Sequence, residues 1–177
     1  YALNEQETAF AQYDPDRIVE ELMGTGADII VVYAANQFSI AYYPSAIWPQ
    51  HPNLKGRDYF GDLVTRLRER GKKVIGYINW LESRHPEWNT VPLGSDPAQC
   101  HAELPLATWA DPADPARRVQ NVPGGNWRQP CINSPRREEV KAVAREIVER
   151  YSLDGFHLDM FHANGALCVC DYCRPTL

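Results

Sequence analysis

Leu153–Cys173 reads LDGFHLDMFHANGALCVCDYC, and this stretch decides how the rest of the chain is interpreted. Within Asp154–Met160, Gly155, His157 and Asp159 alternate with the apolar residues Phe156, Leu158 and Met160. Successive side chains of a strand point to opposite faces, so this alternation predicts a strand that ends at a carboxylate. Enzymes built from β/α units keep their chemistry at that end of a strand.

Three cysteines follow the expected strand closely, at Cys168, Cys170 and Cys173. The chain has five cysteines, an odd number, and these three are too close together for a comfortable disulfide framework. Metal ligation in a reducing compartment suits this pattern better. The cysteines therefore favour a cytoplasmic protein, while the sequence leaves the compartment itself open.

Helical and strand-like patterns alternate upstream of this stretch. Helices are predicted over Pro15–Met23 (after the capping residue Asp14), Asp58–Arg70 and Pro135–Tyr151. Strands are predicted over Asp28–Ala35, Lys73–Trp80, near Arg128–Asn133, and over Asp154–Met160. This alternation is typical of an α/β fold with a parallel sheet. About four parallel strands with long βα loops correspond to the N-terminal half of a TIM (β/α)8 barrel, because a closed barrel needs eight strands.

The chain is interpreted as one partial barrel domain over residues 1–177, with two long loops. Asn36–Gly56 is rich in aromatic residues and follows the first expected strand, so we expect it on the catalytic face. Leu81–Gln129 shows no periodicity and is expected to be a long irregular loop or insertion.

Composition narrows the classes of partner. The net charge of −5 argues against a nucleic-acid surface, which needs clustered Lys and Arg. No apolar run approaches the roughly 20 residues of a membrane helix, so we expect no membrane partner. Five Trp and nine Tyr fit a large aromatic core and a sugar-stacking cleft equally well.

Strand alternation also selects candidate substrate-binding residues. Tyr33, Tyr77 and Asn79 are expected to face the barrel interior near its mouth, where they either bind substrate or pack in the core. Trp80 is a candidate for stacking on a sugar face, and His162 follows the expected carboxylate closely enough to reach a substrate.

Three stretches of the chain together resemble a known family. HPNLKGRDYFGDLV, RHPEW and CINSPRREEV…DGFHLDMF…CVCDYC are similar to the hypothetical glycosyl hydrolase family often numbered six. That family is a (β/α)8-barrel group related to α-L-fucosidases and α-amylase-like barrels. The resemblance runs from about Asp14 to Cys173, and it implies a carbohydrate substrate.

The resemblance implies a role for Asp159. DGFHLD is similar to the α-amylase word DGFRLD, whose aspartate is the nucleophile at the end of the fourth strand, and His157 stands where that word has Arg. In a retaining glycosidase the acid/base carboxyl lies about 5–5.5 Å from the nucleophile. In the amylases that residue comes from the fifth strand, so it is expected beyond Leu177. The structural alternative is that Asp159 only accepts hydrogen bonds from a loop.

The cysteines resemble a second pattern, that of the zinc-containing β-galactosidases of glycoside hydrolase family 42. This resemblance implies a structural zinc bound by four thiolates, at Cys131, Cys168, Cys170 and Cys173. Cys100 is a less favoured fourth ligand, and unrelated thiols are the alternative. Met160-Phe161 stands where those enzymes have Asn-Glu, so their activity is not carried over.

Two functional hypotheses follow. The first is a retaining glycoside hydrolase fragment with Asp159 as nucleophile and its acid/base outside this chain. The second is a non-catalytic, zinc-stabilised carbohydrate-binding or structural barrel segment in a larger assembly. Either way, a half-barrel exposes unpaired strand edges, so we expect a C-terminal half-barrel or an oligomeric partner to cover them.

Overall fold

The computed structural model describes residues 10, 12–36, 39–79, 109–111, 114–119, 133 and 136–159. The elements are α1 (Pro15–Gly24), β1 (Ile29–Tyr33), the 3-10 helix η2 (Pro52–Leu54), α2 (Tyr59–Glu69), β2 (Lys73–Asn79), β3 (Trp109–Asp111), β4 (Asp114–Val119), α4 (Arg136–Arg150) and β5 (Gly155–Asp159). The predicted α/β alternation is confirmed in these residues, with element ends that differ slightly from the expected ones.

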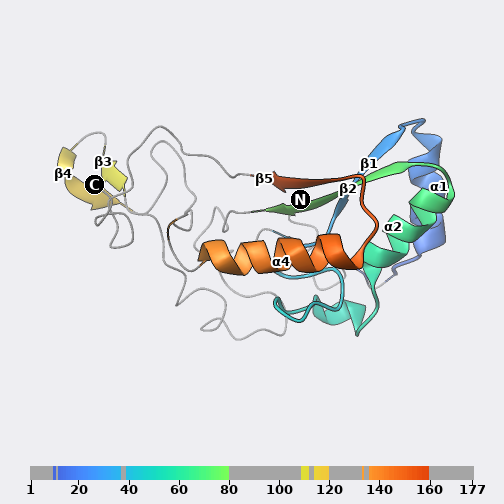
Figure 1. Cartoon of the computed structure of the whole chain (residues 1–177), viewed down its shortest axis with the longest axis horizontal. Coiled ribbons are helices and arrows are strands. Elements are labelled where there is room, and N and C mark those ends of the chain that lie inside the picture. Colours follow the sequence, from blue (N-terminus) through green and yellow to red (C-terminus); the bar gives the residue numbers. More distant parts are fainter. Residues whose placement is uncertain are drawn as a thin grey trace.

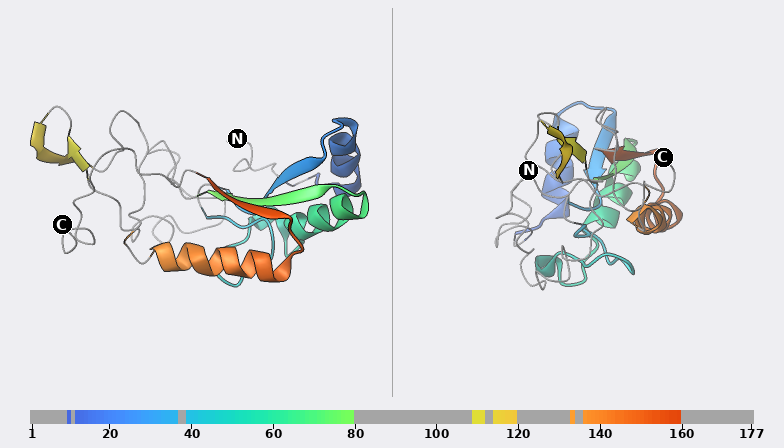
Figure 2. Two further views of the ribbon diagram at one scale, coloured as in Figure 1. Left: turned by 45° about the horizontal axis from the view of Figure 1, so that its top comes forward. Right: turned by 90° about the vertical axis from the view of Figure 1, so that its left-hand side faces the viewer.

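β1, β2 and β5 form a parallel sheet in the order β1-β2-β5. Two rows of the register matter for function. Tyr33 lies beside Tyr77, which lies beside His157, and in the next row Asn79 lies beside Asp159. Figures 1 and 2 show the three strands side by side with α4 running along the sheet.

The position of the last strand corrects the expected strand count. β2 is hydrogen-bonded to β5 directly, so no strand lies between them in this sheet. The strand predicted near Arg128–Asn133 falls almost entirely outside the described residues, and Asn133 is in a turn. In the described part of the chain the parallel sheet has three strands, and Asp159 lies on the third rather than the fourth.

Leu81–Gln129, which was expected to be irregular, contains two short strands. β3 and β4 pair antiparallel with a register shift between Ala110 and Asp111. They form a two-stranded sheet separate from the parallel one. The rest of this segment lies outside the described residues.

The two faces of the parallel sheet differ in burial. Side chains at even positions of β1, such as Ile30 and Val32, are buried against the helices. The same core includes Val19 of α1, four residues of α2 and three of α4: Phe60, Leu63, Val64, Leu67, Val140, Val143 and Ile147.

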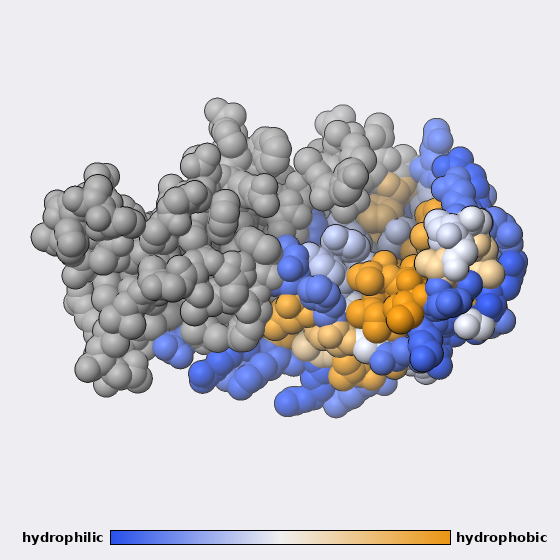
Figure 3. Space-filling model, turned by 90° about the horizontal axis from the view of Figure 1, so that it is seen from above, coloured by the Kyte–Doolittle hydropathy of each residue, from blue (hydrophilic) through white to orange (hydrophobic). Residues whose placement is uncertain are grey.

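The opposite face of the sheet, called here the odd face, is open along β1. Ile29, Val31 and Tyr33 are 56%, 49% and 43% exposed, which is unusual for large apolar side chains on a parallel strand. Seen from above, hydrophobic residues form an open patch among hydrophilic ones (Figure 3). The helices therefore account for the burial of one face only.

Two aspartates begin the helices that flank the first strand. Asp14 accepts hydrogen bonds from the backbone N–H groups of Asp16 and Arg17, which confirms its expected capping role. Asp58 caps α2 by accepting from the N–H of Gly61 at 2.8 Å. Each carboxylate satisfies backbone donors that have no partner in the first helical turn.

Gly76, on the buried side of β2, lets side chains approach the sheet closely. A Cβ at this position would lie 2.7 Å from Leu153 Cδ1 and 3.3 Å from carbons of both Phe60 and Phe156. Three apolar side chains from different elements thus converge on the glycine. The core can pack at this depth only because residue 76 has no side chain.

We expect Gly76→Ala to lower the free energy of unfolding by about 1–3 kcal/mol, because the added methyl overpacks this contact. Gly24→Ala, the control, places a methyl at the end of α1 with nothing within 4 Å. That variant should be as stable as the parent or slightly more stable. Denaturant unfolding measures both, and equal stability of the two variants would contradict the packing.

The loop between β1 and α2 is packed against α4 rather than left open. Tyr43 is fully buried and Trp48 is 3% exposed, and the indole N–H of Trp48 donates to Glu139. Their burial makes the loop part of the core.

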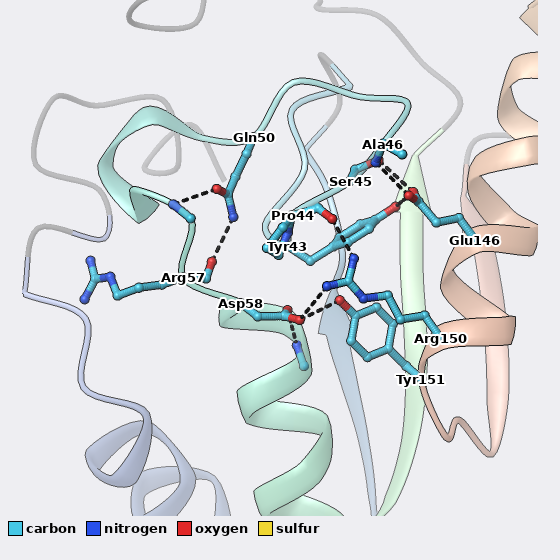
Figure 4. A network of polar contacts seen from close by, with 12 residues as sticks. Tyr43, Pro44, Ser45, Ala46, Gln50, Arg57, Asp58, Glu146, Arg150 and Tyr151 are labelled. Atoms are coloured by element: carbon cyan, nitrogen blue, oxygen red, sulfur yellow. Dashed lines mark hydrogen bonds and ion pairs between the residues drawn. The ribbon is translucent and has the colours of Figure 1, made fainter.

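Glu146 of α4 is the main polar anchor of this loop (Figure 4). Its carboxylate accepts hydrogen bonds from Tyr43 Oη, Ser45 Oγ and the Ala46 N–H, all at 2.7 Å. Burial raises the pKa of Glu146, but these hydrogen bonds and the charge of Arg150 outweigh it, so the pKa lies below the ordinary 4.5. The anchor therefore depends on the ionised carboxylate.

Replacing Glu146 with Gln should lower the free energy of unfolding by about 1–3 kcal/mol at neutral pH, because three donors lose a charged acceptor. The folded-state pKa is depressed, so this stabilisation is present above pH 4.5 and is lost as the pH falls through the folded value. The difference between parent and variant should shrink in acid. Glu149→Gln, at an exposed position of the same helix, is the control. A difference that is independent of pH would contradict the role of the carboxylate.

Candidate active site

The structure brings five of the predicted site residues to one place. Tyr33, Tyr77, Asn79, His157 and Asp159 all lie on the odd face, towards the C-terminal ends of the three strands. Parallel strands end at the same edge of a sheet, so residues distant in sequence meet there. The register places these residues on one face of the sheet, and their position inside a barrel and their chemical roles stay predictions.

Hydrogen bonds link three of these side chains. The Tyr77 hydroxyl donates to Asp159 Oδ2, and Asn79 Nδ2 donates to the Tyr77 oxygen at 3.4 Å. Asn79 lies beside Asp159 in the register, and Tyr77 lies two residues before Asn79 on the same face of β2. The long side chain of Tyr77 reaches Asp159 diagonally across the two strands. One carboxylate oxygen is thus held by a neutral donor from the adjacent strand.

The surroundings of Tyr77 keep its hydroxyl protonated. Burial, followed by the hydrogen bond to Asp159, raises the pKa of Tyr77 far above its ordinary value of 10.0. Tyr33 and the charge of Asp159 add to this effect, and the hydrogen bond from Asn79 opposes it. The group facing Asp159 is therefore a donor over the whole range in which proteins work.

Three aromatic side chains, called here the aromatic row, lie side by side across the sheet two residues before Asp159: Tyr33, Tyr77 and His157. The ring centroids of Tyr33 and Tyr77 are 4.1 Å apart, and those of Tyr77 and His157 are 5.3 Å apart. The three residues are direct neighbours in the sheet register, so the strand pairing itself brings their tilted rings into contact. Tyr77 in the middle is held from both sides and is 8% exposed.

His157 faces the second carboxylate oxygen. His157 Nε2 lies 3.7 Å from Asp159 Oδ1, which is too long for a hydrogen bond but within range of an ion pair when the imidazole is protonated. The side chains of His157 and Asp159 are 53% and 36% exposed. The carboxylate of Asp159 is therefore partly open to solvent.

The remaining predicted site residues lie outside the described residues. These are the substrate-binding candidates Trp80 and His162, and the zinc candidates Cys131, Cys168, Cys170 and Cys173. Among the described residues, no group of three or more His, Cys, Asp or Glu side chains is placed to hold a metal ion. The zinc prediction is not tested by that finding.

Two open grooves lie elsewhere, between α2 and the C-terminal end of α4. They have volumes of about 440 and 550 Å³, and both are lined by Thr65, Glu69, Arg150 and Tyr151. Neither is lined by residues of the sheet. They belong to the helical side of the molecule and not to the site on the odd face.

Sequence reasoning missed how Tyr77 and Asp159 are related. It placed Tyr77 among the substrate-binding candidates, whereas in the structure the Tyr77 hydroxyl donates a hydrogen bond to the carboxylate of Asp159. The sequence contains the two residues but not the register of β2 against β5, and the expected intervening strand would have kept them apart. Direct pairing of the two strands was the missing signal.

A parallel α/β sheet with a carboxylate at the end of one strand is consistent with a segment of a barrel-type enzyme. Residues 14–160 match the model of the family described as hypothetical glycosyl hydrolase 6. The chain therefore belongs to the hypothetical glycosyl hydrolase 6 family.

A solved structure supports the same class. The chain is similar to α-L-fucosidase isoenzyme 2 from Paenibacillus thiaminolyticus, with a TM-score of 0.68 and 25% sequence identity over 93% of this chain. It spans only 22% of that enzyme's length. No curated protein matches the chain. Among the described helices, none has the length and apolar character needed to cross a membrane.

Proposed function

We propose that this chain is part of a glycoside hydrolase in which Asp159 is the nucleophile of a retaining mechanism. The observation that carries the proposal is a partly exposed carboxylate at the C-terminal end of a parallel strand, on the face not covered by helices. Membership of a glycosyl hydrolase family supports this assignment. A strand-end carboxylate is where barrel enzymes keep their catalytic groups.

Two displacements at the anomeric carbon make up the proposed reaction. Asp159 Oδ1 attacks that carbon while the bond to the leaving oxygen breaks, and an acid residue gives the leaving oxygen a proton. The product is a glycosyl ester of Asp159. Water then attacks the same carbon and gives a proton to the same acid/base residue. The ester bond breaks and its electron pair returns to Asp159.

The acid/base and the rest of the barrel are proposed to come from residues outside this chain. The odd face supports this view, because Ile29 and Val31 are half exposed and parallel sheets are normally covered on both faces. Further strands of a longer polypeptide would bury these side chains and pair with the outer edges of β1 and β5. A partner subunit is the other possible source.

The substrate class is proposed to be a carbohydrate, with α-L-fucosides as the first candidates. The support is the similarity to an α-L-fucosidase over nearly the whole of this chain. A panel of aryl glycosides that begins with the α-L-fucoside therefore tests the proposal, using the natural polypeptide that contains this chain.

Asp159→Ala should reduce hydrolysis of an aryl glycoside by at least about 1000-fold, because no covalent intermediate can form. Azide should restore turnover and yield a glycosyl azide of inverted configuration at the anomeric carbon, since the small anion occupies the space of the lost carboxylate. Gas or liquid chromatography and NMR identify this product.

Asp28→Asn is the matched control, because Asp28 precedes β1 at the opposite end of the sheet and its side chain is 98% exposed. This control should keep full activity. If Asp159→Ala retained activity comparable to that of the control, the proposed nucleophile would be wrong.

A structural zinc bound by Cys131, Cys168, Cys170 and Cys173 is proposed separately, on the chemistry of the donor set. Four thiolates form a closed tetrahedral site, which has no open position for substrate. When bound, the metal would supply stability and no catalytic chemistry.

Elemental analysis of the purified protein should find about one zinc per chain. Cys170→Ser should lower the zinc content and the melting temperature, because one thiolate ligand is lost. Cys100→Ser should leave both unchanged, since Cys100 is outside the proposed ligand set. Loss of zinc in the Cys100 variant alone would contradict the assignment.

A further inference from the structure

We infer that Tyr77 is the positioning residue of Asp159: it holds Oδ2, leaves Oδ1 as the attacking oxygen, and assists the departure of Asp159 from the glycosyl-enzyme. The inference rests on the proposed function and adds to it a residue with a defined place in the reaction.

The two carboxylate oxygens of Asp159 have different surroundings. Oδ2 accepts the hydroxyl of Tyr77, whereas Oδ1 has His157 Nε2 at 3.7 Å and no hydrogen bond from it. A hydrogen-bonded oxygen is a poorer nucleophile than its neighbour, because its electron density is drawn to the donor. The contact therefore fixes both the orientation of the carboxylate and the choice of attacking oxygen.

Tyr77 is itself held in place on three sides. Its ring lies between Tyr33 and His157 in the aromatic row, and its oxygen accepts from Asn79. It is nearly buried, and its raised pKa keeps the hydroxyl proton on the oxygen. A donor with so little freedom loses little entropy when the carboxylate changes charge during the reaction.

The hydrogen bond acts differently in the two steps. In the first step, negative charge leaves Asp159 as the ester forms, and the bond to Tyr77 becomes weaker. In the second step, the Oδ1–carbon bond breaks and charge returns to the carboxylate, so the bond becomes stronger. Hydrogen bonds to charge that develops in the transition state are the ones that accelerate a step. Tyr77 should thus promote hydrolysis of the ester more than its formation.

Tyr77→Phe keeps the aromatic row and removes only the hydroxyl. In the natural polypeptide, with an activated aryl glycoside that the parent hydrolyses, kcat should fall about 100-fold, the scale found when one donor to developing charge is removed. KM should fall as well, because the glycosyl-enzyme accumulates. A burst of released phenol and a protein mass increased by one glycosyl unit should accompany the slow turnover.

Tyr151→Phe is the matched control. The Tyr151 hydroxyl also donates to an aspartate, Asp58, at 2.7 Å, but on the helical side of the molecule. This variant should be somewhat less stable than the parent. Its kcat and KM should equal those of the parent, and it should show no burst. The contrast separates a role in the reaction from a role in folding.

Several outcomes would overturn the inference. An unchanged kcat in Tyr77→Phe, or a lower kcat without a burst and without the mass increase, would do so. If Tyr77→Phe does not fold, Asn79→Ala should show a smaller decrease in kcat, again with a burst. An unchanged kcat in Asn79→Ala would then overturn the inference. Inactivity of the parent on every aryl glycoside overturns the proposed function itself, whereas an active parent with no accumulation in the variant overturns this inference alone.

Discussion

The direct parallel pairing of β5 with β2 is the constraint on which the candidate site depends. It places Asn79 beside Asp159 and Tyr77 beside His157, although about 80 residues separate the two strands in sequence. A register shifted by one residue would turn Asp159 towards the helices, where its neighbours are apolar. The hydrogen bond from Tyr77 to the carboxylate follows from this alignment.

The helical side of the sheet supports this alignment through packing and a few charged contacts. Gly76 allows Leu153, Phe60 and Phe156 to pack against the helical side of β2, the strand that carries Tyr77. Asp154, just before β5, accepts from the Val74 N–H and pairs with Arg68, which ties the start of β5 to β2 and α2. The odd face has no comparable cover along β1, and this asymmetry separates the structural side from the candidate active side.

Local patterns in the sequence were sufficient to predict the helices and strands, but not which strands are neighbours in the sheet. Period-2 alternation identified β5, and capping residues such as Asp14 identified where helices begin. These signals depend on residues close in sequence. Strand order depends on pairing across long connections, so the sequence could not show that β5 pairs with β2. The same limit explains why the sequence did not predict the contact of Tyr77 with Asp159. The sequence also could not show that Trp48 is buried, because that burial depends on α4, about 90 residues away.

The central claim is that Asp159 becomes covalently bound to the sugar. Incubation of the natural polypeptide with a 2-deoxy-2-fluoroglycosyl fluoride of the sugar it hydrolyses should trap the ester, because the fluorine slows its hydrolysis. Proteolysis and tandem mass spectrometry then locate the label. The account predicts a single labelled peptide with the modification on Asp159. A label on any other carboxylate, or inactivation of the parent without a label at Asp159, would contradict it.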